Sequence, residues 1–437
     1  MQMGGFFLLN LLIVFKKNYI NKTLTGSAYN LILLILAGES IYILTYVLAR
    51  VFRPTFLDVF NLSNFQLGSL FSIYGVVALI SYLYGGVIAD KYPPGKLMAT
   101  ALFSTALGGL VLATFPSFFI LQLLYAYWGF TTVFLFWGAM IKATRLWGGS
   151  KNQGKAFGFL DGGRGLVAAS LGSIGVYIFS IVLKSDITSA SVLERQEAFR
   201  YVILFSSITV IIIGFLVLYF MKTDTKNQEI NINSINSFEN IKSVIKIKSV
   251  WLMMTIIMSA YVGYKLTDIY SLYASEVMLY NEIKAAEIGA LQLYLRPIVC
   301  FLIGFLADKT SSIKLIIFGF SVMLIGALFF SSGIITNTMN FIFSLSLITT
   351  AVGTYAIRAL YFAVFNEGRV PLKITGTAVG IISIVGYTPD IFATPIMGYL
   401  LDTYPGITGH QYVFMILVLF SLLGLIASIK FSKISSK

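Results

Sequence analysis

Twelve apolar runs of membrane-spanning length limit the fold of this chain more than any other feature. The first six lie near 30–55, 65–89, 97–114, 119–143, 156–183 and 200–221, and the other six near 251–275, 287–307, 314–334, 340–364, 375–400 and 411–430. About 20 apolar residues span the hydrocarbon core as a helix, which satisfies its own backbone polar groups. Only 11% of the residues are charged, whereas soluble domains carry roughly 25%. We therefore expect an all-α membrane protein with twelve transmembrane helices in two six-helix bundles.

One long polar stretch, 222–248, separates the sixth run from the seventh and suggests the domain boundaries. We expect a cytoplasmic or interfacial segment at 1–28, six-helix bundles at 29–221 and 251–431, a cytoplasmic linker at 222–250 and a tail at 432–437. The short apolar run 6–15 precedes Lys16 and Lys17, whereas a signal peptide carries its positive charge before the apolar region. The run is therefore expected to remain as an uncleaved interfacial segment.

The net charge of +13 is distributed as in a membrane protein. With the N-terminus inside, 21 of the 31 Lys and Arg residues fall in cytoplasmic segments, 6 on the outer side and 4 within helices. This asymmetry follows the positive-inside rule and predicts that both termini are cytoplasmic, with no nucleic-acid partner. The single cysteine, Cys300, and the single histidine, His410, in the expected loop before the last helix, exclude a disulfide and a His/Cys metal cluster. No metal and no cofactor are expected.

The two halves of the chain also share short motifs at nearly constant offset. The pairs are 86–91 with 304–309, 154–158 with 376–380, and 46–50 with 261–265, at separations of 218, 222 and 215 positions. Parallel repeats of six helices are the architecture of secondary transporters whose halves move about a site near the membrane midplane.

With these motifs the chain resembles the major facilitator superfamily over essentially its whole length from about Tyr29. The most specific motif is a loop G-x-x-x-D-[RK], which occurs twice. Its residues are Gly86, Asp90 and Lys91 in the first half, and Gly304, Asp308 and Lys309 in the second. The resemblance implies a pseudo-twofold axis along the membrane normal, alternating access and a gating role for the loop aspartates. The pattern is nearest to the organophosphate and organic anion antiporter-like bacterial branch, which implies a monomer in the bacterial inner membrane.

Ionisable residues inside the apolar runs are informative because each costs at least ~2.5–3.5 kcal/mol at a helix centre. Runs three, six, nine and twelve have none in their cores. The other runs contain Glu39, Arg50, Asp161, Arg164, Lys265, Asp268, Arg296, Arg358 and Asp390. The resemblance places helices 3, 6, 9 and 12 outside and the others around the transport cavity, which agrees with this distribution.

Arg50 and Lys265 occupy equivalent positions in the two halves, so we expect them to face each other across the cavity and to bind an anion together. The resembled branch has a basic residue in each of these helices with tyrosines beside it. The tyrosines here are Tyr42, Tyr46, Tyr261 and Tyr264. Lys265 is a point charge where the branch has the two-pronged guanidinium of Arg. The alternative is that Arg50 extends to the outer membrane interface.

Three further residues are candidate substrate contacts. Arg296 is either an anion ligand or a salt-bridge partner, and Trp137 and Tyr387 either contact the substrate or pack the interior. Lys265 and Asp268 lie three positions apart on one helix face and could pair with each other.

The carboxylates supply candidates for proton coupling, because a carboxyl group in an apolar cavity can bind and release a proton. The candidates are Glu39, Asp268 and Asp390. Permanent ion pairs with Arg50, Lys265 or Arg296 are the alternative. Other charged residues are expected to form gates toward the cytoplasm. They are Asp90, Lys142, Arg145, Asp161 and Arg164 in the first half, and Asp308, Arg358 and Glu367 in the second.

These observations predict a secondary active transporter for a small anionic organic solute, phosphorylated or carboxylated, driven by protons or by exchange. A zwitterion such as an amino acid would suit Lys265 with Asp268, and a polycarboxylate siderophore would suit the excess of cations. A solute receptor or scaffold that does not transport is the alternative from another class. No nucleophile–base constellation suggests an enzyme.

Overall fold

The structure confirms an all-helical membrane fold with twelve candidate spans in the part of the chain that it describes. This computed structural model describes residues 28–148, 153–183, 190–221, 242, 244–361, 364, 367–368 and 375–435. The spans are Ala28–Val51, Asn64–Tyr82, Pro94–Leu112, Phe118–Thr144, Gly158–Val182, Val192–Phe220, Lys248–Glu276, Glu282–Gly304, Ser312–Ser331, Asn340–Leu360, Ile381–Thr403 and Ile407–Ile434. The predicted segments 1–27, with the run 6–15, and 222–241 lie outside the described residues.

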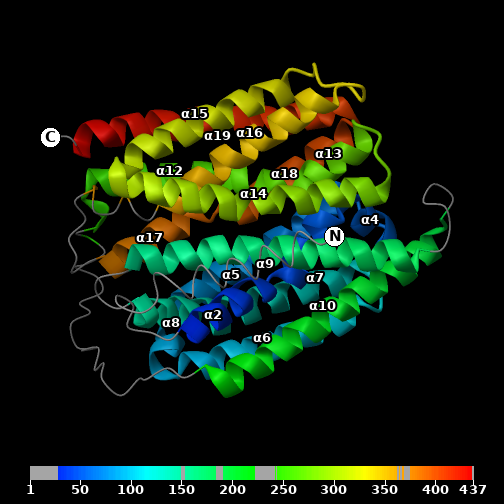
Figure 1. Cartoon of the computed structure of the whole chain (residues 1–437), viewed down its shortest axis with the longest axis horizontal. Coiled ribbons are helices and arrows are strands. Elements are labelled where there is room, and N and C mark those ends of the chain that lie inside the picture. Colours follow the sequence, from blue (N-terminus) through cyan, green and yellow to red (C-terminus); the bar gives the residue numbers. More distant parts are fainter. Residues whose placement is uncertain are drawn as a thin grey trace.

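The helices form two bundles that lie side by side (Figure 1). The first bundle contains α2 (Ala28–Ser40), η1 (Ile43–Val47), α3 (Leu48–Val51), α4 (Arg53–Val59), α5 (Asn64–Lys91), α6 (Pro94–Leu112), α7 (Phe118–Gly129), η2 (Phe130–Trp137), α8 (Gly138–Gly148), α9 (Gln153–Val182) and α10 (Val192–Phe220). The second contains α12 (Lys248–Leu266), η4 (Thr267–Ile269), α13 (Tyr270–Glu276), α14 (Glu282–Lys309), α15 (Ser312–Ser331), α16 (Asn340–Leu360), α17 (Thr375–Gly386), α18 (Pro389–Thr403) and α19 (Ile407–Ser435). Each bundle has its own apolar core.

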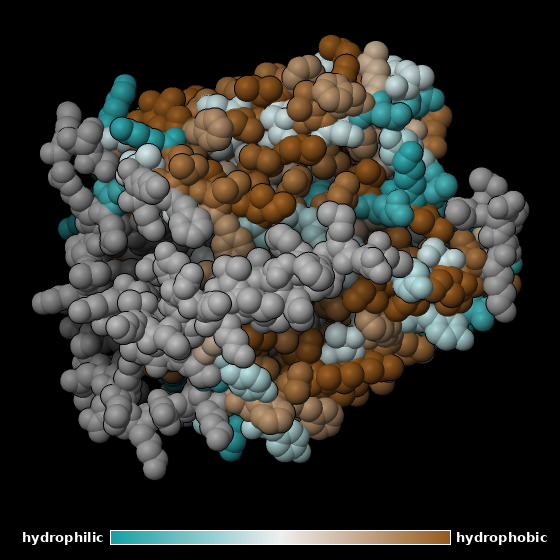
Figure 2. All heavy atoms as spheres, viewed as in Figure 1, coloured by the Kyte–Doolittle hydropathy of each residue, from teal (hydrophilic) through white to brown (hydrophobic). Residues whose placement is uncertain are grey.

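Two helix pairs make the most extensive contacts between the bundles: α5 packs against α18, and α9 packs against α14. Shorter contacts join α3 and α4 to α13 and α14. On the outside, α10 covers α6, and α15 packs against α16 and α19. Most described side chains along the helices in Figure 2 are hydrophobic, and hydrophilic ones gather toward the helix ends. Ile208 and Ile212 of α10, for example, are each 54% exposed. Such a surface is suited to a bilayer and not to water.

Several spans are interrupted near their middle. In the first span η1 is a π-helical turn, with the amide of Val47 bonded to the carbonyl of Tyr42 at 3.2 Å. In the seventh span the 3₁₀ turn η4 separates α12 from α13, and in the eleventh α17 ends at Gly386 before α18 begins at Pro389. Proline lacks the amide hydrogen that a continuous helix would need, which explains the last interruption. Irregular backbone at membrane depth is tolerated where protein or a water-filled cavity surrounds it.

The two ends of the interface between the bundles differ. We call the end where α10 ends and α12 begins the linker end, at the left in Figure 1, and the opposite end the far end. At the far end both oxygens of Asp402 accept hydrogen bonds from the first amides of α5, at 2.8 Å from Asn64 and 2.6 Å from Phe65. A Cβ on Gly68 would lie 2.4 Å from the carbonyl oxygen of Thr394. The backbones of α5 and α18 therefore touch there.

The surroundings of the interface glycines differ along these helices. Gly158 of α9 and Gly304 of α14 have no described atom within 4 Å of the point where a Cβ would stand. By contrast, a Cβ on Gly289, near the far end of α14, would lie 2.9 Å from the backbone of Val51. The two helices still touch toward the linker end, since the rings of Phe159 and Phe301 lie 6.3 Å apart.

The expected loop position of the histidine was wrong. His410 lies within α19, is fully buried, and its Nε2 is 2.9 Å from Oε2 of Glu276 at the end of α13. Its ring also packs edge-on against Tyr273. The residue therefore joins two helices of the second bundle at the far end.

Candidate functional site

The ionisable residues predicted inside the spans gather between the two bundles, in two groups. We call Arg50, Lys265, Asp268 and Asp390 the neutral cluster, and Glu39, Asp161, Arg164, Arg296 and Arg358 the arginine cluster. Both draw residues from the first and the second bundle. Because lipid cannot solvate these charges, helices that carry them are stable only when the charged faces meet inside the protein.

The neutral cluster lies where the interruptions of the seventh and eleventh spans meet the first span. Arg50 Nε donates to Asp268 Oδ1 at 2.5 Å. Lys265 Nζ lies 3.0 Å from Asp390 Oδ1 and 3.7 Å from Asp268 Oδ2. Two cations thus face two carboxylates, and the formal charges cancel. The expected pairing of Lys265 with Asp268 is present, but it is the longer contact for both residues. Asp268 lies closer to Arg50, and Lys265 lies closer to Asp390.

Aromatic rings enclose the lysine of this cluster. Lys265 Nζ lies 4.3 Å from the ring centre of Tyr46 and 5.1 Å from that of Phe71. The hydroxyl of Tyr261 donates to both oxygens of Asp390, at 3.1 and 3.0 Å. The side chain of Lys265 is 1% exposed and that of Arg50 is 2% exposed. Both predicted substrate cations are therefore already partnered in this conformation.

The arginine cluster is arranged around Asp161 of α9. Arg296 Nη2 donates to Asp161 Oδ1 at 2.5 Å, and Arg358 Nε lies 3.8 Å from Asp161 Oδ2. Arg164 Nε donates to Glu39 Oε2 at 3.1 Å, and Arg296 Nη1 lies 3.8 Å from the same oxygen. Three guanidinium groups thus face two carboxylates, which leaves one positive charge in excess.

Several donors of this cluster lack a hydrogen-bond partner among the described residues. They are Nε and Nη1 of both Arg296 and Arg358. The side chain of Arg296 is 1% exposed and that of Arg358 is 11% exposed, whereas that of Asp161 is 24% exposed. Buried donors are nearly always bonded to protein or water, because an unpaired one is costly. These donors are therefore suited to an anionic ligand that reaches the cluster past Asp161.

Tyr264 connects the two clusters. Its ring lies between two guanidinium groups, with its centre 3.8 Å from Cζ of Arg358 and 4.7 Å from Cζ of Arg50. Arg50 Nη1 also donates to its hydroxyl at 3.2 Å. A cation over an aromatic face is attracted by the ring quadrupole, so the ring of Tyr264 stabilises both guanidinium groups.

A group of aromatic residues adjoins the clusters. The ring of Tyr82 stacks on Tyr387 at 6.2 Å and meets Trp137 edge-on at 6.3 Å. The hydroxyls of Tyr387 and Tyr361 lie 3.2 Å apart. Trp137 and Tyr387, both predicted substrate contacts, are thereby linked through Tyr82, which the sequence analysis did not single out. Tyr42, also predicted, lies under the guanidinium of Arg164 at 5.5 Å.

The structure places the predicted gating residues in several surroundings. Asp161, Arg164 and Arg358 belong to the arginine cluster. Lys142 Nζ donates to the carbonyl of Ala89 at 2.8 Å. The carboxylate of Glu367 accepts hydrogen bonds from the first amides of α15, at 2.8 Å from Ser312 and 3.3 Å from Ile313. The side chains of Asp90, Arg145 and Asp308 lie outside the described ones.

No group of three or more His, Cys, Asp or Glu side chains that could hold a metal ion occurs in the described part of the chain.

Comparisons with known proteins agree with this architecture. The model of the Major Facilitator Superfamily matches residues 31–389. The inner membrane protein YqcE of Escherichia coli strain K12 is 28% identical over 359 residues, covering 81% of this chain and 82% of the relative. The inner membrane protein YihN of the same organism is 26% identical over 409 residues, covering 92% and 94%.

Solved structures share the fold at low sequence identity. A bacterial homologue of the human lysosomal transporter Spinster, inward-facing and unoccupied, has a TM-score of 0.68 at 17% identity over 94% of this chain and 98% of that one. The nucleoside transporter NupG has a TM-score of 0.67 at 14% identity over 93% and 100%. At such identities the likeness extends to the fold and not to the substrate.

Proposed function

Because the chain belongs to the major facilitator superfamily, we propose that this membrane transporter moves a small anionic organic solute, phosphorylated or carboxylated, which binds at the arginine cluster. The observation that carries the proposal is the excess positive charge of this cluster together with the unbonded donors of Arg296 and Arg358. An anion placed there would neutralise the charge and accept the missing hydrogen bonds.

The chemistry of the cluster favours an anion with two or more oxygens. A guanidinium group presents its N–H donors as a planar fork that matches a carboxylate or a phosphate. Arg296 and Arg358 belong to α14 and α16 of the second bundle, and Arg164 belongs to α9 of the first. A solute that contacts all three would hold the bundles together, as alternating access about an interface site requires.

Arg50 and Lys265 have a different role in this proposal. With Asp268 and Asp390 they form the part of the site where a proton is exchanged, because protonation of either carboxylate would release Lys265 from one partner. Glu39 would serve the arginine cluster in the same way through Arg164. A zwitterion is the second candidate solute, since partly exposed Asp161 could hold its ammonium beside the arginines.

We further propose that the linker end faces the cytoplasm. The basic residues near the helix ends support this orientation through the positive-inside rule. The open spaces at Gly158 and Gly304 would then give the solute access to the site from the cytoplasmic side. Import and export are both compatible with this arrangement.

A thermal-unfolding screen with anionic metabolites tests the proposed site on purified wild type, Arg358→Gln and Lys284→Gln. Lys284 is an exposed cation at the start of α14, away from the clusters, and is the matched control. We expect phosphate esters or carboxylates to stabilise the wild type and the control, and Arg358→Gln to need at least about tenfold more ligand because it loses a charge-assisted bond. Equal stabilisation of all three proteins would contradict the site.

Transport is tested separately in proteoliposomes with the best stabilising ligand. We expect uptake by the wild type that is driven by a pH gradient or by internal ligand, and no uptake by Arg358→Gln. Binding without movement under either driving force would indicate a solute receptor. Uptake at a rate that depends neither on the pH gradient nor on internal ligand would contradict the proposed role of the carboxylates.

A further inference from the structure

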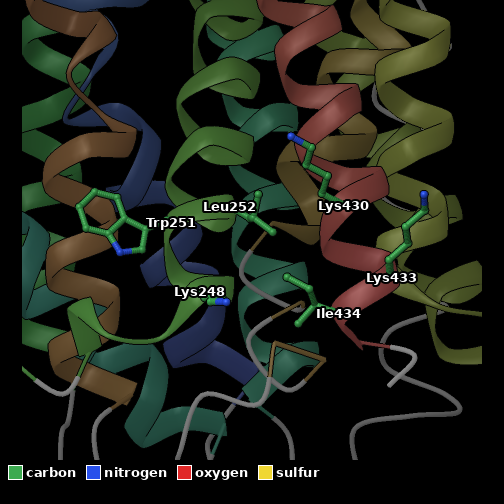
Figure 3. Close-up of a pocket in the computed structure, with 6 residues that line it drawn as sticks. All are labelled: Lys248, Trp251, Leu252, Lys430, Lys433 and Ile434. Atoms are coloured by element: carbon green, nitrogen blue, oxygen red, sulfur yellow. The ribbon is translucent and has the colours of Figure 1, made fainter.

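A groove at the linker end of the second bundle lies away from both clusters. It has a volume of about 440 Å³ and is lined by Lys248, Trp251, Leu252, Lys430, Lys433 and Ile434. Figure 3 shows the first three residues on α12 and the other three on α19. The lining thus combines ammonium groups with apolar side chains.

We propose that this groove binds an anionic phospholipid of the surrounding membrane. The lysines would contact the phosphate of the headgroup, and an acyl chain would lie along Trp251, Leu252 and Ile434. Basic pockets between transmembrane helices suit anionic lipids. The positive charge of the pocket contacts the headgroup, and the adjoining apolar surface contacts the acyl chains.

The lysines lie close to the ends of their helices, where a membrane-spanning helix reaches the headgroups. Lys248 is the first residue of α12, and α19 ends at Ser435. Lys430 precedes that end by five residues, which corresponds to about 8 Å along a helix. This distance is within the reach of a lysine side chain that keeps its stem in apolar surroundings and its ammonium group at the interface.

Trp251 forms a fixed, exposed wall beside the lysines. Its indole nitrogen donates to the carbonyl of Ile245 at 2.7 Å, yet the residue is 54% exposed. The ring therefore holds its position without being buried in the core of the bundle. Tryptophan with a bonded N–H and an exposed apolar face is typical of the boundary between headgroups and acyl chains.

The surface around the groove favours a lipid over a protein segment. The exposed face of α19 continues from the groove through Ile426, Leu423 and Leu419, which are 51%, 48% and 60% exposed. This apolar stripe runs along the span and would contact acyl chains over its length. An occupant with a charged head at the lysines and a long apolar tail along the stripe fits the whole surface.

Fluorescence quenching of the full-length protein in zwitterionic detergent tests this proposal. The probe is phosphatidylglycerol with brominated acyl chains, compared with brominated phosphatidylcholine of the same chains. We expect the anionic lipid to quench the tryptophan emission at lower concentration, and Trp251→Phe to remove most of the quenching. The three other tryptophans remain as an internal control.

The headgroup contact is tested with the double variant Lys248→Gln/Lys430→Gln. We expect its affinity for phosphatidylglycerol to fall by about tenfold, because each lysine contributes to attraction of an anionic headgroup. Lys314→Gln, which removes an exposed cation at the same end of the bundle from α15, should leave the affinity unchanged. Unchanged thermal stability of the double variant in detergent alone would show that it is folded.

Three results would overturn the proposal. One is equal quenching by the two brominated lipids, which would show that the groove does not recognise the anionic headgroup. Another is displacement of the lipid by inorganic phosphate at equal concentration, which would indicate a site for free anions. The third is stronger quenching of Trp251 by a nitroxide attached at Ser234→Cys than by the brominated lipid, which would assign the groove to the linker.

Discussion

The neutral cluster and the arginine cluster lie at the same interface, but they balance their charges differently. In the neutral cluster Arg50 and Lys265 each have a carboxylate oxygen within 3.0 Å. In the arginine cluster the nearest carboxylate oxygen of Arg358 is 3.8 Å away, and donors of two arginines lack partners among the described residues. The two clusters thus differ in how closely their cations are paired, and breaking a buried pair is costly because it leaves a charge uncompensated.

The largest expected effect comes from removing the central carboxylate of the arginine cluster. Asp161→Asn would leave three guanidinium groups facing Glu39 alone, because Arg358 would lose its ion-pair partner and Arg296 would keep only Glu39 at 3.8 Å. We expect a loss of about 3–5 kcal/mol in the free energy of unfolding, measured by denaturant titration in detergent. Asp161→Asn/Arg358→Gln should recover part of the loss. If Asp161→Asn alone is as stable as the wild type, ligand or water already compensates the charges of the three arginines.

The same change in the neutral cluster should cost less. Asp268→Asn would deprive Arg50 of its carboxylate, but Lys265 would keep Asp390 at 3.0 Å. We expect a loss on the order of 2–4 kcal/mol, measured under the same conditions. The variant also gives the neutral cluster a positive charge in excess, so it should bind the anionic ligand more tightly. If ligand affinity falls instead, excess charge is not what distinguishes the clusters.

A third test addresses proton coupling through Asp390. Asp390→Asn should cost about 2 kcal/mol, because Lys265 would keep Asp268 at 3.7 Å. We expect exchange of internal for external solute to continue and uptake driven by a pH gradient to stop. Both are measured in proteoliposomes with labelled solute. Gradient-driven uptake at the wild-type rate would show that Asp390 carries no transported proton.

The smallest effect is expected at the ring that joins the clusters. Tyr264→Leu would remove the aromatic surface between Arg50 and Arg358, with a loss of about 1–2 kcal/mol. Tyr264→Phe keeps the ring and loses one hydrogen bond at 3.2 Å, so it should cost about 1 kcal/mol or less. Thermal unfolding of both variants compares the two contributions. If Tyr264→Phe loses as much stability as Tyr264→Leu, the hydroxyl and not the ring stabilises the link between the clusters.

The sequence was sufficient for the twelve spans and for the meeting of the buried charges. Hydrophobic length is a local property, and the cost of charge in lipid forces charged faces inward wherever the helices pack. The pairing of Lys265 with Asp268 was also predictable, because residues three apart share a helix face.

Ion pairs with Arg50, Lys265 or Arg296 were among the alternatives, but which carboxylate pairs with which cation across the interface was not predictable. Asp268 bonds to Arg50 and Asp161 bonds to Arg296, in each case from the other bundle. Such pairs depend on the depth and rotation of each helix, which no local pattern encodes.

The π-helical turn of the first span and the aromatic residue Tyr82 were missed for related reasons. The turn Ile43–Val47 contains no proline or glycine that would mark it in the sequence. Aromatic residues make up 15% of this chain, so a single uncharged tyrosine carries little information before its neighbours are known. Only its stacking on Tyr387 sets it apart.

The clasp that Asp402 makes with the first amides of α5 has a consequence for the transport cycle. At the far end it joins the bundles through hydrogen bonds to backbone amides, strengthened by the positive end of a helix dipole, and Asp402 belongs to neither cluster. In the proposed transport cycle this contact would favour the conformation that is closed at the far end. A substitution at Asp402 would then shift the balance between conformations without altering the proposed solute contacts.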